Sequence, residues 1–396
     1  MNEKKLLLEG IRVLDFSTLL PGPLCTLYLS ELGAEVIKVE HPVAFDGTRK
    51  LGTTFSNSNQ NTYFYLLNRN KKSLAINYKR AEGVEILKKL LPKVDILVEG
   101  FRPGMMEKIG LGYEEAAKIN PKIIYVSISG FGATSIYKDY AGHDANYLAI
   151  SGVLDLLSET RPTLPAVQIA DVMGSYSALA QIGFALYHRE RTGQGSFIDV
   201  SITNSTLPVA MLAIGDLLGS KTYDKNKTPL AGLLPNYQVY ECKDKRYIVV
   251  AALEPMFLQV FLRLIQREDL WELTINGNYE YVKRELQKYF INKTYKDLDF
   301  LFQNPNSCVF PILKLHEVME HPHFIQTQMF VEINDKEIGI LKLPRIPFRF
   351  SNLETKTHSP PPKLGQHTEE ILKELNISKE KMANLEKQKI ILRNKE

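Results

Sequence analysis

The stretch IRVLDFSTLLPGPLCTLYLSELGAEVIKVE, residues 11–40, decides the fold. It opens with a short β-branched run, continues as a helical pattern that ends at Gly33, and returns to a second β-branched run. Two such runs joined through a helix form a βαβ unit, because the connection is far longer than a hairpin turn. The alternation continues through three further runs, SLAIN at 73–77, DILVE at 95–99 and IIYVSIS at 123–129.

This repeated alternation predicts an α/β fold. Helical patterns separate the later runs, near residues 80–91 and 113–119. Right-handed crossovers of this kind build a parallel sheet with helices on both faces. Because parallel sheets bind ligands beyond the carboxyl ends of their strands, we expect the ligand at the loops that follow the predicted strands. These loops are residues 17–23, 41–50, 100–104 and 130–140.

The second half of the chain begins with a long helix and then enters a second lobe. The helix is predicted from Asp171 to Arg189. Residues 219–236 place glycines and prolines among lysines, which is typical of a connector. The apolar run YIVVAAL, residues 247–253, then predicts a buried strand of the second lobe. From residue 376 onward the Lys/Glu/Leu-rich tail is expected to be a surface helix or frayed.

Composition and charge exclude several classes of protein. The 396 residues carry 49 Lys and Arg against 45 Asp and Glu, a formal charge of +4, and residues 373–396 supply +3 of it. The remainder is nearly neutral, which argues against a nucleic-acid partner. The longest apolar run has about seven residues, whereas a membrane helix needs roughly 18 or more, so we expect no membrane partner.

The cysteines and the N-terminal residues favour a cytoplasmic location. Cys25, Cys242 and Cys308 are odd in number, far apart and without a CxxC pair, which fits a reducing compartment. Only three leucines follow Lys4 and Lys5, so no signal-peptide apolar region is expected.

Two motifs invite a cofactor interpretation that their spacing disfavours. GFGATS, residues 130–135, follows a predicted strand but lacks a third glycine and opens no helix, so nicotinamide and flavin chemistry is disfavoured. HEVMEHPH, residues 316–323, crowds three histidines with two glutamates. His316 and His321 are five positions apart, roughly 140° around a helix, so they do not share one metal-binding face. We therefore predict no metal site.

A basic cluster gathers around the predicted strand ends and the segment NRNKKS. Taken alone, such a cluster is more often a solvated surface. Because its segments converge on the ligand edge of the sheet, we predict that it binds a multiply phosphorylated ligand. The residues assigned to this ligand are Arg49, Arg69, Lys72 and Arg102, with Lys50 and Lys71 beside them and Gly130 and Gly132 on the neighbouring loop.

Three residues are candidates for acid–base chemistry: His143 in AGHDANYLAISG, Asp171 in VQIADVMGS and Glu254 in VVAALEPMF. Each also has a purely structural interpretation, as a loop histidine, a helix N-cap and a strand end before a proline. Considered together, a histidine and a carboxylate that face each other across a small cavity can exchange a proton with opposite faces of one carbon.

Many ordered motifs resemble the family III CoA-transferase superfamily, which includes carnitine-CoA transferase, formyl-CoA transferase and α-methylacyl-CoA racemase. The resemblance runs from about residue 8 to about residue 375. The segments that carry it are LEGIRVLDFSTLLPGPLCTLYLSELGAEVIKVEHP, LNRNKKSLAIN, VEGFRPGMMEKIGLGYEE, GHDANYLAISGVL, ADVMGS, RTGQGSFIDVS, YIVVAALEPMF, CVFPI and PPPKLGQHTEEIL.

The resemblance implies a large Rossmann-like domain built from both chain ends, a smaller α+β domain and an interlocked homodimer. On this expectation residues 1–218 form the N-terminal part of the large CoA-binding domain, and residues 219–328 form the small domain. Residues 329–375 return to complete the large domain, and residues 376–396 are a charged tail. Acyl-CoA is then the substrate, and no separate cofactor is required.

Within the superfamily, Asp171 falls on the aspartate that transferases use as a nucleophile and the racemase uses as a base. GHDANYLAISG resembles the histidine-bearing loop of the racemase, and LEPMF resembles the segment whose glutamate supports that histidine. The sequence therefore predicts an isomerase of 2-methyl-branched acyl-CoA thioesters, in lipid metabolism, that works through an enolate. The alternative is a CoA transferase in which Asp171 forms an acyl anhydride.

Overall fold

The computed structural model describes residues 6–158, 160–355 and 358–394. The chain forms two compact units. The first comprises residues 1–158, 162–210 and 328–396, and the second comprises residues 159–161 and 211–327. The second unit therefore begins eight residues before the expected boundary at residue 219 and ends one residue before residue 328.

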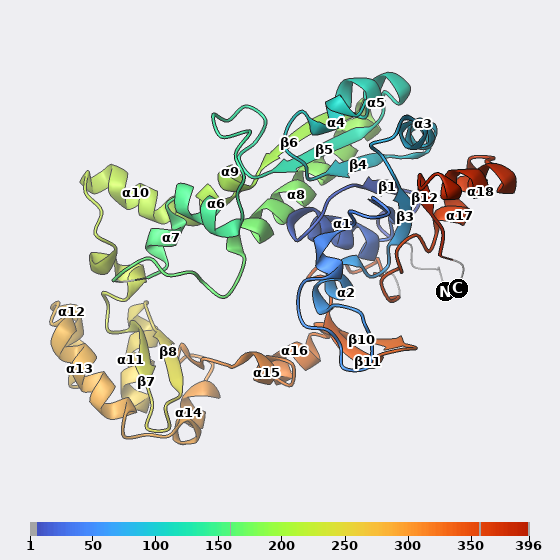
Figure 1. Cartoon of the computed structure of the whole chain (residues 1–396). Coiled ribbons are helices and arrows are strands. Elements are labelled where there is room, and N and C mark those ends of the chain that lie inside the picture. Colours follow the sequence, from blue (N-terminus) through green and yellow to red (C-terminus); the bar gives the residue numbers. More distant parts are fainter. Residues whose placement is uncertain (1–5, 159, 356–357, 395–396) are drawn as a thin grey trace. The chain divides into compact units, whose positions relative to one another are not determined.

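The first unit contains a seven-stranded sheet with the order β12-β3-β2-β1-β4-β5-β6 (Figure 1). All neighbouring strands are parallel except the β12–β3 pair. The five β-branched runs of the sequence are all strands, which confirms the prediction of a parallel sheet. The strands are β1 (Arg12–Asp15), β2 (Glu35–Glu40), β3 (Lys72–Ile76), β4 (Ile96–Glu99), β5 (Ile124–Ser129), β6 (Ser196–Ser201) and β12 (Ile391–Leu392).

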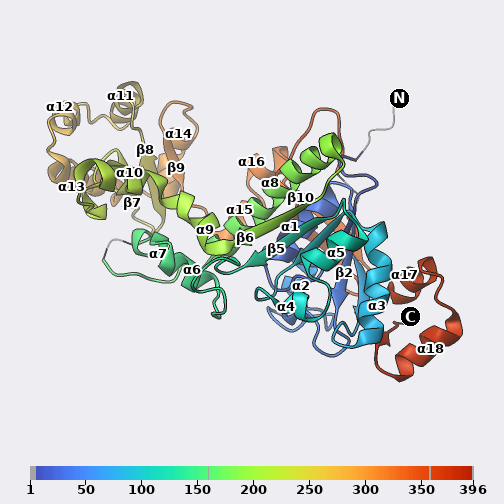
Figure 2. The ribbon, with the colours of Figure 1, turned by 90° about the horizontal axis from the view of Figure 1, so that it is seen from above.

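Helices cover both faces of this sheet (Figure 2). On one face lie α1 (Pro21–Glu31) and the long α8 (Ile169–Thr192), which pack on each other. On the other face, α3 (Ala81–Leu90), α5 (Tyr113–Ile119) and α17 (Thr368–Glu374) share one apolar core with the strands. The sheet is therefore doubly wound. The remaining helices of this unit are α2 (Thr62–Asn68), α4 (Met105–Lys108), α6 (Asp144–Ile150), α7 (Val153–Leu156), α9 (Ile202–Thr206) and α18 (Lys379–Lys387).

The C-terminal tail, expected to be a surface helix or frayed, forms the helix α18 and is part of the sheet domain. Met382 and Leu385 of α18 are buried in the same core as the strands. Ile391 of β12 pairs with Ile76 of β3 in antiparallel register. The charged composition hid this role, because a helix that buries only two positions per two turns is polar on average.

The segment that returns from the second unit is tied to α1 by Glu31. The Glu31 carboxylate accepts hydrogen bonds from Nε of Arg69 at 2.6 Å and from the backbone N–H of Ile346 at 3.1 Å. His358 lies 3.4 Å from the same carboxylate. The segment also contains the hairpin β10 (Phe330–Asp335) and β11 (Gly339–Pro344). Both chain ends therefore contribute to the first unit.

The second unit is a small α+β body. Its three antiparallel strands are β7 (Tyr237–Glu241), β8 (Tyr247–Ala251) and β9 (Val309–Pro311). The run at residues 247–253 is therefore a strand, as expected. Its helices are α10 (Met211–Ser220), α11 (Pro255–Leu264), α12 (Leu270–Ile275), α13 (Tyr279–Phe290), α14 (Asp299–Phe302), α15 (Leu315–Val318) and α16 (Pro322–Gln326).

Two helical stretches of the described chain are long and apolar enough to cross a membrane by length and composition. They are residues 169–192 and 202–220, each with a mean hydropathy of 1.2. The first is α8, which packs on α1 and on strands β5 and β6 as the core helix of an α/β domain does. The absence of a membrane partner stays a prediction.

Candidate active site

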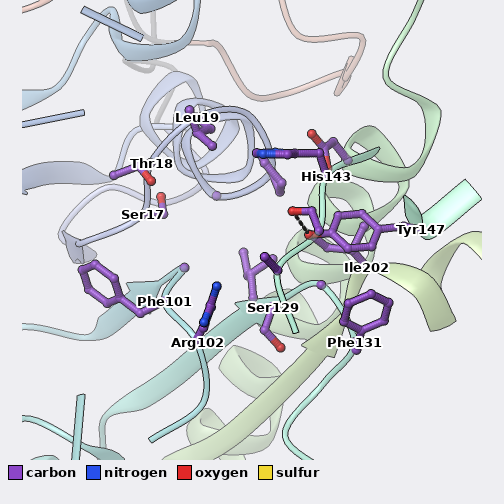
Figure 3. Close-up of a pocket in the computed structure, with 18 of the residues that line it drawn as sticks. Ser17, Thr18, Leu19, Phe101, Arg102, Ser129, Phe131, His143, Tyr147 and Ile202 are labelled. Carbon is purple, nitrogen blue, oxygen red and sulfur yellow. Dashed lines mark hydrogen bonds between the residues drawn. The ribbon is translucent and has the colours of Figure 1, made fainter. Parts of the chain in front are cut away.

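A cavity of about 360 Å³ lies at the carboxyl ends of the central strands (Figure 3). Its walls come from the loops that follow β1, β4 and β5, at Ser17–Leu19, Gly100–Pro103 and Ser129–Phe131. The strand order reverses between β1 and β4, so the cavity occupies the switch point where doubly wound sheets bind ligands. Three of the four loops that the sequence predicted as ligand-binding therefore line one cavity.

Asp171 lines this cavity from the first turn of α8. The helix begins at Ile169, so Asp171 is its third residue and not the predicted first. Its backbone N–H donates to Oδ1 of Asp144 over 3.1 Å. Burial, and then the charge of Asp144, raise the pKa of Asp171 to about 7. Burial and the charge of Asp144 thus oppose the helix dipole, which favours the ionised carboxylate.

His143 lines the same cavity and precedes α6. Its backbone N–H donates to Oδ1 of Asn146 over 3.0 Å, which fixes the start of the helix. Figure 3 shows His143 along one side of the cavity and Phe101 with Arg102 along the other. The structure thus brings His143 and Asp171, which are 28 positions apart, to one cavity.

Glu254 lies in the second unit, where it is the exposed residue before α11. Its carbonyl accepts the backbone N–H groups of Phe257 and Leu258, each at 3.0 Å. This is the structural role of a residue before a proline at the first helical position. Its predicted support of His143 stays a prediction.

Four residues of the predicted basic cluster have carboxylate partners within the first unit. One is Lys71, which is fully buried with its Nζ atom 3.2 Å from Oδ2 of Asp15. Arg49 binds Glu40 through two hydrogen bonds of 2.8 and 2.7 Å. Arg69 is 2% exposed and binds Glu31. Lys72 lies 2.7 Å from both Glu35 and Glu370. Their charges are already compensated, and none of these residues lines the cavity. Their predicted contact with the phosphorylated ligand stays a prediction.

Arg102 is the member of the predicted set whose side chain lines the cavity, and Lys138 joins it there. Lys138 was not among the residues predicted to bind the ligand, although it lies within the loop of residues 130–140 that the sequence placed at the ligand edge of the sheet. The two cations give the cavity wall a positive charge, which suits the phosphates of a nucleotide.

The two predicted glycines have separate surroundings. Gly130 lines the cavity, and a Cβ atom there would lie 2.5 Å from the ring of Tyr147, so only glycine fits. Gly132 has φ of +84°, which favours glycine, and it lines a neighbouring hollow beside Asp199. Gly130 therefore shapes the cavity, whereas Gly132 shapes the turn beside it.

Asp144 is a site residue that sequence reasoning missed. It accepts the amide of Asp171 and raises the pKa of that residue. The available signal was its position directly after His143 in the motif GHD. Within the described residues no group of three or more His, Cys, Asp or Glu side chains could hold a metal ion.

The fold and the cavity define a doubly wound α/β protein with acid–base groups at the switch point of its sheet. The chain matches CoA-transferase family III over residues 8–368. It is 36% identical over 379 residues to the succinyl-CoA:glutarate CoA-transferase of Mus musculus, an alignment that covers 93% of this chain and 86% of the relative. It is 32% identical over 394 residues to the α-methylacyl-CoA racemase of Mus musculus, covering 98% of both.

The crystal structure of a CAIB/BAIF family protein from Brucella suis has the same fold, with a TM-score of 0.81 and 28% identity, covering 93% of this chain and 99% of the other. The protein belongs to CoA-transferase family III. It is therefore an enzyme of the superfamily that contains both CoA-transferases and racemases.

Proposed function

We propose that the protein is a racemase of 2-methyl-branched acyl-CoA thioesters. The observation that carries this proposal is that His143 and Asp171 line one cavity, with the pKa of Asp171 raised to about 7. A carboxyl group that titrates near neutral pH both takes up and releases a proton at that pH. The similarity to the mouse racemase over 98% of both chains supports the same reaction.

The proposed reaction uses one base on each face of the α-carbon. The Asp171 carboxylate removes the α-proton, and the electron pair of the broken C–H bond forms an enolate with its charge on the thioester oxygen. The imidazolium of His143 then donates its proton to the opposite face, which forms the new C–H bond and restores the thioester. The other enantiomer reacts with the two residues in exchanged roles, and Glu254 is proposed to orient the imidazole.

The enolate oxygen needs hydrogen-bond donors as its charge develops. The N-terminal turn of α8 is the proposed source, because its amide groups and its dipole favour negative charge there. The amide of Asp171 is already bonded to Asp144. The proposal therefore assigns the role to the amides of Ile169 and Ala170, the first two residues of the helix.

A CoA transferase is the second candidate, supported by the 36% identity to the mouse succinyl-CoA:glutarate CoA-transferase. In that reaction Asp171 attacks the thioester carbonyl and displaces the CoA thiolate, which leaves an acyl–aspartyl anhydride. CoA then passes to a second carboxylic acid. His143 has no required role in this chemistry.

Isotope exchange separates the two candidates. The purified protein is incubated with 2-methylacyl-CoA thioesters in deuterated water, and the α-position is examined by mass spectrometry. We expect one deuterium at the α-carbon and loss of optical purity. A protein that incorporates no deuterium, yet moves CoA between carboxylic acids and forms a hydroxylamine-sensitive acyl-enzyme, is a transferase.

The pH dependence of exchange tests the role of Asp171 as a base. Its carboxylate form is lost as pH falls through about 7, so exchange from the enantiomer that it deprotonates should fall in that range. Asp144→Asn keeps an acceptor oxygen for the Asp171 amide but removes a negative charge, so the fall should move to lower pH.

The raised pKa of Asp171 also makes the stability of the folded protein depend on pH. Because the folded-state pKa of Asp171 is raised, the folded protein binds this proton more tightly than the unfolded chain. That contribution is complete below the unfolded pKa near 4 and is lost as pH rises through about 7. Asp144→Asn should therefore melt at a higher temperature than the wild type at pH 8, and this difference should be smaller at pH 5. An unmoved pH profile together with unchanged stability would exclude the coupling between the two carboxyl groups.

Binding of the CoA moiety is proposed to depend on Arg102. CoA should raise the melting temperature of the wild-type protein, and Arg102→Ala should reduce that increase with little effect on the unliganded protein. Lys72→Ala is the control, because Lys72 is bound to Glu35 and Glu370 and does not line the cavity. An equal loss in both variants would contradict a specific role for Arg102.

A homodimer is the proposed assembly, in a cytoplasmic location and without a nucleic-acid partner. Phe184 and Tyr187 on α8 are 74% and 64% exposed, and large apolar side chains exposed on one helix are typical of an interface. Sedimentation or light scattering should give about twice 45.1 kDa. An active monomer would contradict the proposal.

A further inference from the structure

The cavity wall formed by residues Ser17–Leu19 contains a leucine in an unfavourable backbone conformation. Leu19 has φ of +66°, in the left-handed region that residues with a Cβ atom rarely adopt. It lies four residues after the end of β1 and lines the cavity with Ser17 and Thr18. A conformation of this kind persists only where the surrounding structure holds it, so the groups behind this wall decide its shape.

Asp46 holds the wall at Leu19. The backbone N–H of Leu19 donates to Oδ1 of Asp46 over 3.2 Å. Asp46 is itself 1% exposed, and the same oxygen accepts the backbone N–H and the hydroxyl of Thr48 at 2.9 and 2.8 Å. The carboxylate is therefore fixed by the turn that follows β2, and Leu19 is attached to a rigid acceptor.

Lys38 holds the wall at Ser17. Its Nζ atom donates to the backbone carbonyl of Ser17 over 2.8 Å and lies 2.8 Å from Oδ2 of Asp46. Both charged side chains are fully buried. The Lys38–Asp46 ion pair therefore fixes the backbone on both sides of Thr18, because Lys38 binds the carbonyl of Ser17 and Asp46 binds the amide of Leu19.

We infer that Asp46 is a positioning residue, which with Lys38 holds the Ser17–Leu19 wall in the shape that receives the CoA thioester. Neither side chain lines the cavity, so each acts through the backbone that does. The inference rests on the proposed function for the identity of the ligand. It adds that the affinity for the thioester is set in part by a buried ion pair behind the loop.

The test measures CoA binding by calorimetry in Asp46→Ala, Leu19→Gly and the double variant. Loss of Asp46 removes the support for the left-handed conformation, so we expect the Kd for CoA to rise about tenfold. Glycine adopts positive φ without that cost, so Asp46→Ala with Leu19→Gly should recover a large part of the affinity. Purely structural damage by Asp46→Ala would not be repaired by glycine at position 19.

Asp224→Ala is the matched control, because Asp224 accepts an amide two residues ahead, that of Asn226 at 3.0 Å, in the same manner but on an exposed turn of the second unit. It should leave the Kd unchanged. Equal affinity of Asp46→Ala and wild type, or no recovery in the double variant, would overturn the inference.

A second measurement needs no variant, since Asp46→Ala leaves Lys38 buried without its partner and its folding is at risk. Hydrogen exchange at the Leu19 amide should be slow in the unliganded wild-type protein. Fast exchange there before CoA is added would overturn the inference. A wild-type protein that binds no CoA would instead contradict the proposed function, while the exchange rate would still decide whether the wall is held in advance.

Discussion

His143→Ala is expected to lower the rate of racemisation by about 10²–10⁴-fold, because the variant lacks the base on one face of the α-carbon. Asp171 remains, so one enantiomer should still exchange its α-proton with solvent. A single base returns the proton to the face from which it was taken. Two quantities are therefore measured on the variant. Incorporation of α-deuterium should persist, whereas loss of optical purity should stop.

His188→Ala is the control for this variant, because His188 is an exposed histidine on α8 outside the cavity. It should leave both rates unchanged. Asp171→Asn should abolish racemisation as well, with any surviving exchange confined to the opposite enantiomer. Full racemisation by His143→Ala would contradict the two-base mechanism, and normal CoA transfer by that variant would favour the second candidate.

Glu31→Ala is expected to destabilise the first unit by about 3–5 kcal/mol, because it leaves the buried Arg69 guanidinium without its carboxylate. It also removes the acceptor of the Ile346 amide, which ties the returning segment to α1. Despite burial, which alone would raise it, the neighbouring His358 and Arg69 hold the pKa of Glu31 below its usual range. Urea unfolding monitored by circular dichroism measures the change.

Glu85→Ala is the matched control. Glu85 lies 3.4 Å from Lys88 on the surface, and its side chain is 66% exposed, so its removal should change stability by less than about 0.5 kcal/mol. Equal midpoints for Glu31→Ala and the wild type would show that neither the Glu31–Arg69 pair nor the bond from the Ile346 amide to Glu31 stabilises the first unit.

The local patterns predicted the sheet well, because a buried parallel strand appears in the sequence as a largely apolar run of consecutive residues. EVIKVE at 35–40 has five buried positions in β2, and its β-branched residues identify it without any distant partner. Two strands of the seven-stranded sheet, β6 and β12, were not predicted from such patterns. β6 is only partly buried at the end of the sheet, and β12 is a two-residue strand that exists through its pairing with β3.

The sequence by itself determined the strands, the ligand-edge loops and the three acid–base candidates, because each depends on neighbours within a few residues. Only the tertiary structure decided which charges are free. Glu31 and Glu35 lie 38 and 37 positions from Arg69 and Lys72, so no local pattern reveals that these cations are already paired. The same holds for Asp171, whose pKa depends on burial and on Asp144, 27 positions away. Coulomb interaction and desolvation act through space, and folding alone sets those distances.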